Sequence, residues 1–303
     1  MKKSIIALAV AGAMTAPMIA QADATLYGSL RFDIDDADKA DTDVSSNMAR
    51  IRFGIKGSEE TNAGLIAGYH VRLNGGNGAA SEPVTTDRAN VYLQGDFGRV
   101  TGGMQADPAE IAEDRVEYTL HSGTAVVLNP DDYTGGGLVY NTNSINGFKA
   151  WAGIGNVDND GASSTQETSL SATYDSDLFG AAVSWAEGTD GKSSYAVSAS
   201  TTLVGATIGA RISDKEDTVD GFALGVSYPL GDWTLAANYE SSEAEGADDS
   251  ASATSISAAY ALGGNATVTL GILEVNAEAE KAKGTGSGLA ENDEITLRYQ
   301  VDF

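Results

Sequence analysis

The alternation of apolar with polar or small residues most constrains how this chain can fold. It runs from Thr25 to Phe303 in about sixteen short segments. One clear segment has Leu65, Ala67, Tyr69, Val71 and Leu73 on one face and Ile66, Gly68, His70 and Arg72 on the other. A period of two without a continuous apolar run is typical of strands with one face in hydrocarbon and the other in water. We therefore expect an all-β fold, a sixteen-stranded antiparallel transmembrane β-barrel.

The first 22 residues have the layout of a cleaved secretory signal. Two lysines precede a short apolar stretch, which ends in two overlapping Ala-x-Ala sites. Cleavage is therefore expected after Ala22 or Ala24. The remaining sequence has no run of roughly 18 apolar residues, which argues against membrane-spanning helices. We expect residues 1–22 to be a signal peptide and residues 23–303 to form a single barrel domain.

The composition limits the chemistry of the chain. The formal net charge is -25, so binding to nucleic acid is not expected. The sequence contains no cysteine and therefore offers no disulfide or thiolate metal site. Acidic residues gather between the predicted strands, for example Asp33, Asp35, Asp36, Asp38, Asp41 and Asp43. This run lacks the glycine and the closing glutamate of an EF-hand loop, and we predict neither a metal site nor a cofactor.

The connections between the predicted strands alternate between short and long. The short ones are 57–64, 95–98, 141–147, 175–180, 202–205, 229–232 and 261–265. The long ones fall at about 35–49, 74–85, 105–135, 156–166, 187–192, 213–219, 241–252 and 275–293. This arrangement places both ends of the barrel segment on the side of the short turns. Outer-membrane barrels have the same asymmetry, with short periplasmic turns and long outer loops.

The predicted outward faces carry no charge, as a lipid-facing surface requires. They include Leu26, Leu30, Phe32, Ile51, Phe53, Ile55, Ala206, Ile208, Ala210, Ile212, Phe222, Leu224, Val226, Tyr228, Ile295, Leu297, Tyr299, Val301 and Phe303. An arginine or lysine at the membrane midplane would cost roughly 2 to 4 kcal/mol there. Aromatic residues cluster near the strand ends, at Phe97, Phe148, Tyr174, Phe179, Tyr228, Trp233, Tyr260 and Phe303 on the short-turn side and at Trp185 and Tyr239 toward the other. Two such bands indicate interfacial girdles.

The inward faces of the first five strands are basic. They hold Arg31, Arg50, Arg52, Lys56, Arg72, Arg88 and Arg99, with His70 among them. The longest connection, 105–135, is acidic and contains Asp107, Glu110, Glu113, Asp114 and Glu117. The last four of these would share one face of a short helix. If this third loop folds inward, its acids would face Arg31, Arg52, His70, Arg72 and Arg88 across a constriction and create a transverse field. Alternatively, each arginine simply pairs with a nearby carboxylate.

Several motifs resemble those of the general diffusion porins of Gram-negative bacteria, and the resemblance covers the whole chain. They are the Ala-x-Ala signal leading into 25–31 (TLYGSLR), then 46–59 (SNMARIRFGIKGSE), 87–103 (DRANVYLQGDFGRVTGG) and the terminal Phe303 preceded by Tyr299 and Val301. The resemblance implies a homotrimer in the outer membrane, surrounded by lipids and lipopolysaccharide. It also implies an inward-folded third loop and the passage of small hydrophilic solutes and ions. Arg52 and Arg88 match family positions of the basic cluster opposite that loop.

The chain departs from the family pattern at the constriction. Many members have Gly-Arg-Gln where this chain has Gly103-Met104-Gln105, and another basic residue where it has 133–137 (YTGGG). The acidic motif at the tip of the family's third loop is not recognisable, so the loop acids are assigned by composition alone. A constriction that lacks two basic groups in a strongly acidic chain predicts a preference for cations.

Three other functions compete with a diffusion pore. A porin selective for sugars or oligosaccharides would need a track of lumen-facing aromatic rings, for which the candidates are Tyr92, Trp151 and Tyr133. An enzyme would need a site, but the chain has only His70 and His121, with Ser122 beside the latter, and no nucleophile motif. A sealed structural barrel is disfavoured because sixteen strands leave an aqueous channel.

Overall fold

The computed structural model describes residues 24–37, 44–75, 83–122, 133–157, 165–188, 191–246, 250–276 and 293–303. The predicted signal peptide, residues 1–22, lies outside these ranges and stays a prediction. Among the described residues, no helix is long and apolar enough to cross a membrane.

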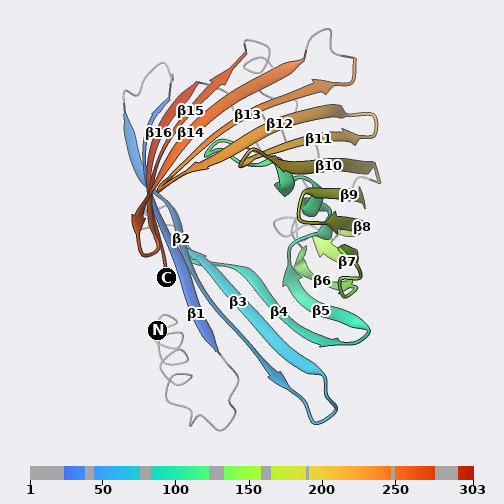
Figure 1. The fold of residues 1–303 in the computed structure, drawn as a ribbon. Coiled ribbons are helices and arrows are strands. Elements are labelled where there is room, and N and C mark those ends of the chain that lie inside the picture. Colours follow the sequence, from blue (N-terminus) through green and yellow to red (C-terminus); the bar gives the residue numbers. More distant parts are fainter. Residues whose placement is uncertain are drawn as a thin grey trace.

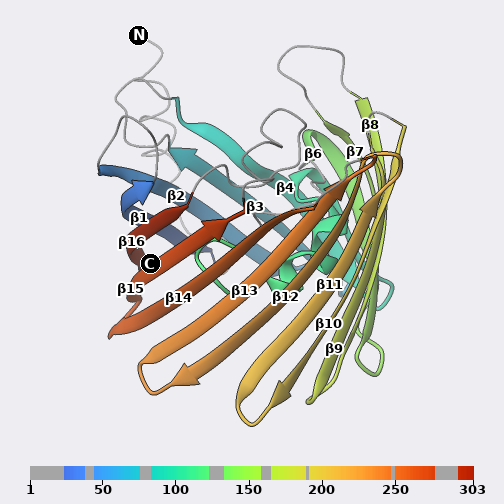
Figure 2. The same cartoon turned by 90° about the horizontal axis from the view of Figure 1, so that it is seen from above.

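Sixteen strands form a closed barrel, as the alternation predicts. They are β1 (Thr25–Ala37), β2 (Ser45–Glu60), β3 (Ile66–Gly75), β4 (Thr85–Gly95), β5 (Gly98–Gln105), β6 (Tyr133–Asn141), β7 (Phe148–Val157), β8 (Thr165–Asp175), β9 (Phe179–Glu187), β10 (Ser193–Leu203), β11 (Ala206–Lys215), β12 (Val219–Leu230), β13 (Trp233–Ala244), β14 (Ala251–Gly263), β15 (Ala266–Val275) and β16 (Glu294–Asp302). Each strand pairs with its neighbours in sequence, and β1 pairs antiparallel with β16 (Figures 1 and 2). Closure leaves no free sheet edge in the membrane, where unpaired backbone groups would be costly.

The seam between the first and last strands is fixed by the terminal residue. Phe303 donates its amide to the carbonyl of Gly28 at 3.0 Å, and Gly28 donates to the carbonyl of Phe303 at 2.7 Å. The Phe303 ring lies so close to Gly28 that any Cβ at this position would overlap it. The absence of a side chain at Gly28 therefore leaves room for the Phe303 ring against β1.

The residues predicted to face lipid are on the outside of the barrel. Large apolar side chains such as Leu26, Phe53, Ile212, Leu224 and Phe303 are exposed. The next residue along each strand points inward, and most of these inward residues are polar or small. The short-turn girdle contains packed ring pairs, with centroids 4.6 Å apart for Phe148 and Tyr174 and 4.8 Å apart for Trp233 and Tyr260. The exterior therefore suits hydrocarbon between aromatic borders.

The lengths of some connections differ from the prediction. The outer connections 188–192 and 216–218 are no longer than the opposite turns 61–65 and 142–147. The reason is that charged residues can continue a strand above the membrane. β11 and β12 pair up to Lys215 and Val219, so residues assigned to a loop extend the sheet instead.

The third loop turns into the barrel after β5, as predicted. It forms two short 3-10 helices, η1 (Pro108–Ala112) and η2 (Asp114–Val116), which Figure 1 shows in green inside the ring of strands. These helices contact the inner faces of β7 to β12. The described part of the loop thus lines one wall of the lumen and leaves β1 to β4 facing it.

Candidate pore constriction

The basic side of the candidate constriction is a set of inward side chains on β1 to β4. These are the predicted residues Arg31 on β1, Arg52 on β2, His70 and Arg72 on β3, and Arg88 on β4. We call Arg31, Arg52, Arg72 and Arg88 the arginine strip. Their strands are neighbours, and cross-strand pairing sets Arg72 directly opposite Arg88.

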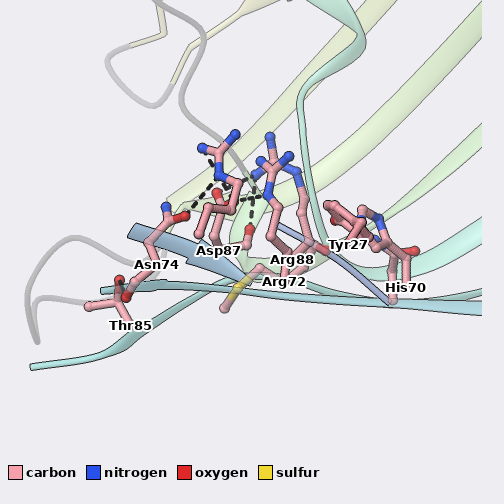
Figure 3. Close-up of polar contacts among 10 residues, drawn as sticks. Tyr27, His70, Arg72, Asn74, Thr85, Asp87 and Arg88 are labelled. Atoms are coloured by element: carbon pink, nitrogen blue, oxygen red, sulfur yellow. Dashed lines mark hydrogen bonds and ion pairs between the residues drawn. The ribbon is translucent and has the colours of Figure 1, made fainter. Parts of the chain in front are cut away.

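A carboxylate lies inside the arginine strip, and sequence reasoning missed it. Asp87 forms ion pairs with Arg72, with Arg88 at 3.2 Å and with Arg52 at 3.8 Å. Figure 3 shows Asp87 beside the guanidinium groups of Arg72 and Arg88. One carboxylate thus neutralises part of the charge of three arginines.

A β-bulge explains why Asp87 escaped the prediction. Strict alternation would turn Asp87 outward, because Arg88 next to it points inward. The pairing of β3 and β4 shifts at this point, so that Arg72 faces Arg88 while Leu73 faces Thr86. The extra residue of a bulge is free of the ladder and can redirect its side chain. Here the bulge turns Asp87 into the lumen beside its neighbour.

The remaining members of the strip are also bound to polar groups. Arg31 donates from Nε to Gln300 Oε1 at 2.7 Å, and Arg52 donates from Nε to Asn74 Oδ1 at 3.0 Å. On β16, Arg298 forms a bidentate ion pair with buried Asp33, at 2.8 and 2.6 Å. The alternative in which inward arginines pair with nearby carboxylates therefore describes this wall in part.

His70 lies nearer the short-turn end than the arginines. Its Nε2 hydrogen-bonds the hydroxyl of Tyr27, and the two rings are tilted with centroids 5.8 Å apart. Lys56 also lies over the Tyr27 ring, with Nζ 5.4 Å from its centroid. The hydrogen bond with Tyr27 of β1 therefore holds the His70 imidazole against the barrel wall.

The acidic side of the candidate constriction is smaller than the sequence suggests. Asp107 and Glu113 are buried against the wall, at 1% and 4% exposure, and Asp107 caps η1 by accepting the amide of Ala109 at 2.6 Å. Glu110 is half-buried, whereas Asp114 and Glu117 are exposed. The prediction of one helical face with four acids is wrong, because two short 3-10 helices replace the single α-helix.

The two exposed acids differ from ordinary surface carboxylates. Partial burial by the surrounding wall, together with the charges of Asp114 and Glu240 and against the opposing charge of Arg211, raises the pKa of Glu117 to about 7. Partial burial also raises the pKa of Asp114. Both carboxyls therefore hold a proton more tightly than in water.

A belt of small inward residues holds the third loop. It runs across β7 to β15 and consists of Gly153, Gly155, Ser171, Ala182, Ala196, Gly209, Gly225, Ser255 and Gly271. A Cβ at Gly225 would lie 2.6 Å from the Tyr118 ring and 2.9 Å from the Val116 carbonyl oxygen. Larger side chains here would push the loop off the wall. The sequence signal for this docking is the run of Gly, Ala and Ser at alternate positions.

Hydrogen bonds fix the loop over the belt. Asn238 on β13 donates from Nδ2 to the Val116 carbonyl at 2.6 Å and accepts the Tyr118 amide at Oδ1 at 3.2 Å. Thr119 and Ser255 share a hydroxyl hydrogen bond of 2.5 Å. Arg115 pairs with Asp175 at the short-turn end of β8, at 2.9 Å. The bonds from Asn238 provide partners for backbone groups of the loop that would otherwise be buried without one.

The three rings considered for a sugar track have different positions. Tyr133 is fully buried, with its hydroxyl 2.8 Å from Ser169 Oγ, so its prediction as a lumen ring is wrong. It fills the space above glycines of β7. Tyr92 and Trp151 do face inward, but each lies under a cation, Arg99 and Lys149 respectively.

No group of three or more potential metal ligands exists within the described ranges. The two histidines also lie at different strands of the wall, separated by β2, β1 and β16. His70 is on β3, whereas His121 packs on Gly271 of β15. Ser122 donates its hydroxyl to the Thr119 carbonyl at 2.8 Å rather than to a histidine.

A closed barrel with an apolar exterior, a polar interior and an inward loop defines a membrane channel. The chain belongs to the Gram-negative porin family, which it matches over residues 7–280. It is therefore an outer-membrane β-barrel, and its family and fold are those of a diffusion channel rather than an enzyme. No protein of curated function matches the sequence.

Solved structures share the fold at low sequence identity. The in-vitro folded, trimeric form of OmpT, an outer membrane protein of Vibrio cholerae, is 16% identical with a TM-score of 0.72, covering 92% of this chain and 99% of that one. The anion-selective porin from Comamonas acidovorans is also 16% identical, with a TM-score of 0.71 and the same coverage. A mutant of the Rh. blastica porin is 19% identical with a TM-score of 0.71, covering 92% and 100%. The likeness shows a common barrel.

Proposed function

We propose that the chain forms a passive, water-filled pore that prefers cations among ions and small hydrophilic solutes. The observation that carries this proposal is the position of Asp87, which partly neutralises the three arginines Arg52, Arg72 and Arg88. The opposite wall exposes Asp114 and Glu117. A cation passing between the two walls therefore meets a weakened basic side and a negative acidic side.

The same proposal assigns the constriction to the predicted residues that face the lumen. The basic side comprises Arg31, Arg52, His70, Arg72 and Arg88, and the exposed acids of the third loop form the other. Asp107 and Glu113 contribute differently, since their burial makes them supports of the loop. Glu110 is half-buried, so its exposure lies between that of the two supporting acids and that of the two exposed ones.

We propose a homotrimer as the assembly, surrounded by outer-membrane lipids and lipopolysaccharide. Family membership and the trimeric form of the V. cholerae neighbour support this assignment. A band on an unboiled gel at three times the chain mass tests it. A band at the mass of one chain under the mildest detergent would contradict it.

A porin selective for sugars is less well supported. Such a pore needs successive ring faces free for stacking, whereas Tyr92 and Trp151 are each covered by a cation and Tyr133 is buried. Catalysis lacks a convergent nucleophile and base among the described residues.

The reversal potential in a planar bilayer across a KCl gradient tests the selectivity. Stepwise conductance with a potential that favours K⁺ supports the proposal. A potential that favours Cl⁻ would refute the cation preference while leaving the pore intact, and no conductance would refute the pore.

A further inference from the structure

Two cations at the short-turn end of the lumen lie over aromatic rings. Arg99 Cζ is 3.4 Å from the centroid of Tyr92, and Lys149 Nζ is 4.7 Å from the centroid of Trp151. Arg99 is the second residue of β5 and Lys149 the second residue of β7, so both follow short turns. Cation–π contact holds each charge at a defined place on the wall.

The two cations are neighbours across the sheet. Arg99 pairs with Asn141 of β6, which in turn pairs with Trp151 of β7. One strand thus separates β5 from β7, and Lys149 lies two residues from Trp151 toward the short turn, so the backbones of Arg99 and Lys149 are about 12 Å apart at a strand spacing of about 4.8 Å and a rise of about 3.3 Å per residue. Long side chains from these positions can reach toward a common solute over that distance.

The pair differs from the arginine strip because it lacks carboxylates. Within the described residues, neither Arg99 nor Lys149 has an ion pair with an acid. The buried Nε of Arg99 also has no hydrogen-bond partner. In a chain with 43 acidic and 18 basic residues, this local absence of acids is notable.

We propose that Arg99 and Lys149 form a binding station for small organic dicarboxylates at the short-turn mouth of the lumen. A planar guanidinium binds one carboxylate with two parallel hydrogen bonds, and an ammonium binds the second as a point charge. Both side chains are half-buried, so they keep access to lumen water while losing some competing solvation. The carbon linker of the solute spans the intervening strand. Binding at Arg99 and Lys149 rests on the proposed open pore but not on the proposed cation preference of the constriction.

The fluorescence of Trp151 provides a direct test of binding. The chain has three tryptophans, so Trp185→Phe and Trp233→Phe leave Trp151 as the single emitter beneath Lys149. The folded trimer or monomer in detergent is titrated with succinate, and separately with propionate at equal ionic strength. Succinate should give a saturable change with an affinity about fivefold higher than propionate, because it forms one more ion pair.

Substitutions then assign the effect to the pair. Arg99→Gln should remove the preference for succinate, whereas Arg99→Lys should keep part of it. Lys56→Gln is the matched control, since it removes another lumen cation that lies over a tyrosine, and it should leave the titration unchanged. Heat-modifiable gel migration checks that each variant folds. Equal affinity for succinate and propionate, or a preference that survives Arg99→Gln, would overturn the proposal.

Discussion

Asp87→Asn is the substitution that most sharply tests how charge is arranged in the constriction. The change leaves the shape of the side chain but removes the carboxylate that Arg52, Arg72 and Arg88 contact. An ion about 5 Å from this group in water interacts with it by about 0.8 kcal/mol, which screening at 0.1 M salt reduces to about 0.5 kcal/mol. Loss of the charge acts with opposite sign on cations and anions. The permeability ratio of K⁺ to Cl⁻ should therefore fall about fivefold.

The assay is the reversal potential of single channels at low and high salt. At 1 M the Debye length is about 3 Å, so the same substitution should change the ratio less than twofold. Asp302→Asn is the matched control, because it removes one carboxylate from the short-turn end of β16. An unchanged ratio at 0.1 M in Asp87→Asn, or an equal fall in the control, would refute the electrostatic reasoning.

Three further predictions concern the loop and the wall. The pKa of Glu117 is raised to about 7, so its negative charge is present above pH 7 and lost as the pH falls through that value. The preference of the pore for cations should therefore decrease between pH 8 and pH 6. Glu117→Gln should flatten this pH dependence. Asn238→Ala removes two bonds to loop backbone and should destabilise loop docking by about 1 to 3 kcal/mol, seen as faster amide exchange and noisier conductance. Asp33→Asn breaks the bidentate pair with Arg298 and should lower stability by roughly 2 to 3 kcal/mol in a urea titration, with an unchanged midpoint as the contrary result.

The strands could be predicted from sequence because their two environments differ strongly. A residue facing lipid and its neighbour facing water leave a period of two at nearly every strand, and closure of sixteen strands follows. Connections were less predictable. Residues above the membrane can be polar on both faces, so the continuation of β11 to Lys215 leaves no signal in the alternation.

The site was predicted only where alternation holds. The alternation predicts that the side chains of the arginine strip face the lumen, as they do. It predicts the wrong direction for the side chain of Asp87, because a bulge adds one residue to the strand there. The prediction for the acids of the third loop is wrong for a different reason. Their spacing fits an α-helix, yet docking onto the wall selects two 3-10 turns and buries Glu113 while exposing Glu117. The bulge between β3 and β4 decides the first outcome and the contacts of the loop across β7 to β15 decide the second, and neither is visible in local sequence.

Cysteine labelling of the third loop tests most directly whether it forms one side of an open pore. The native chain has no cysteine, so Glu117→Cys gives a single reactive thiol. A cationic methanethiosulfonate reagent added to the open channel should reduce the current in discrete steps and weaken the cation preference. Ile256→Cys, on the lipid face, should give no change. Current and selectivity that stay constant while mass spectrometry shows complete labelling of the Glu117→Cys thiol would contradict a constriction formed by this loop.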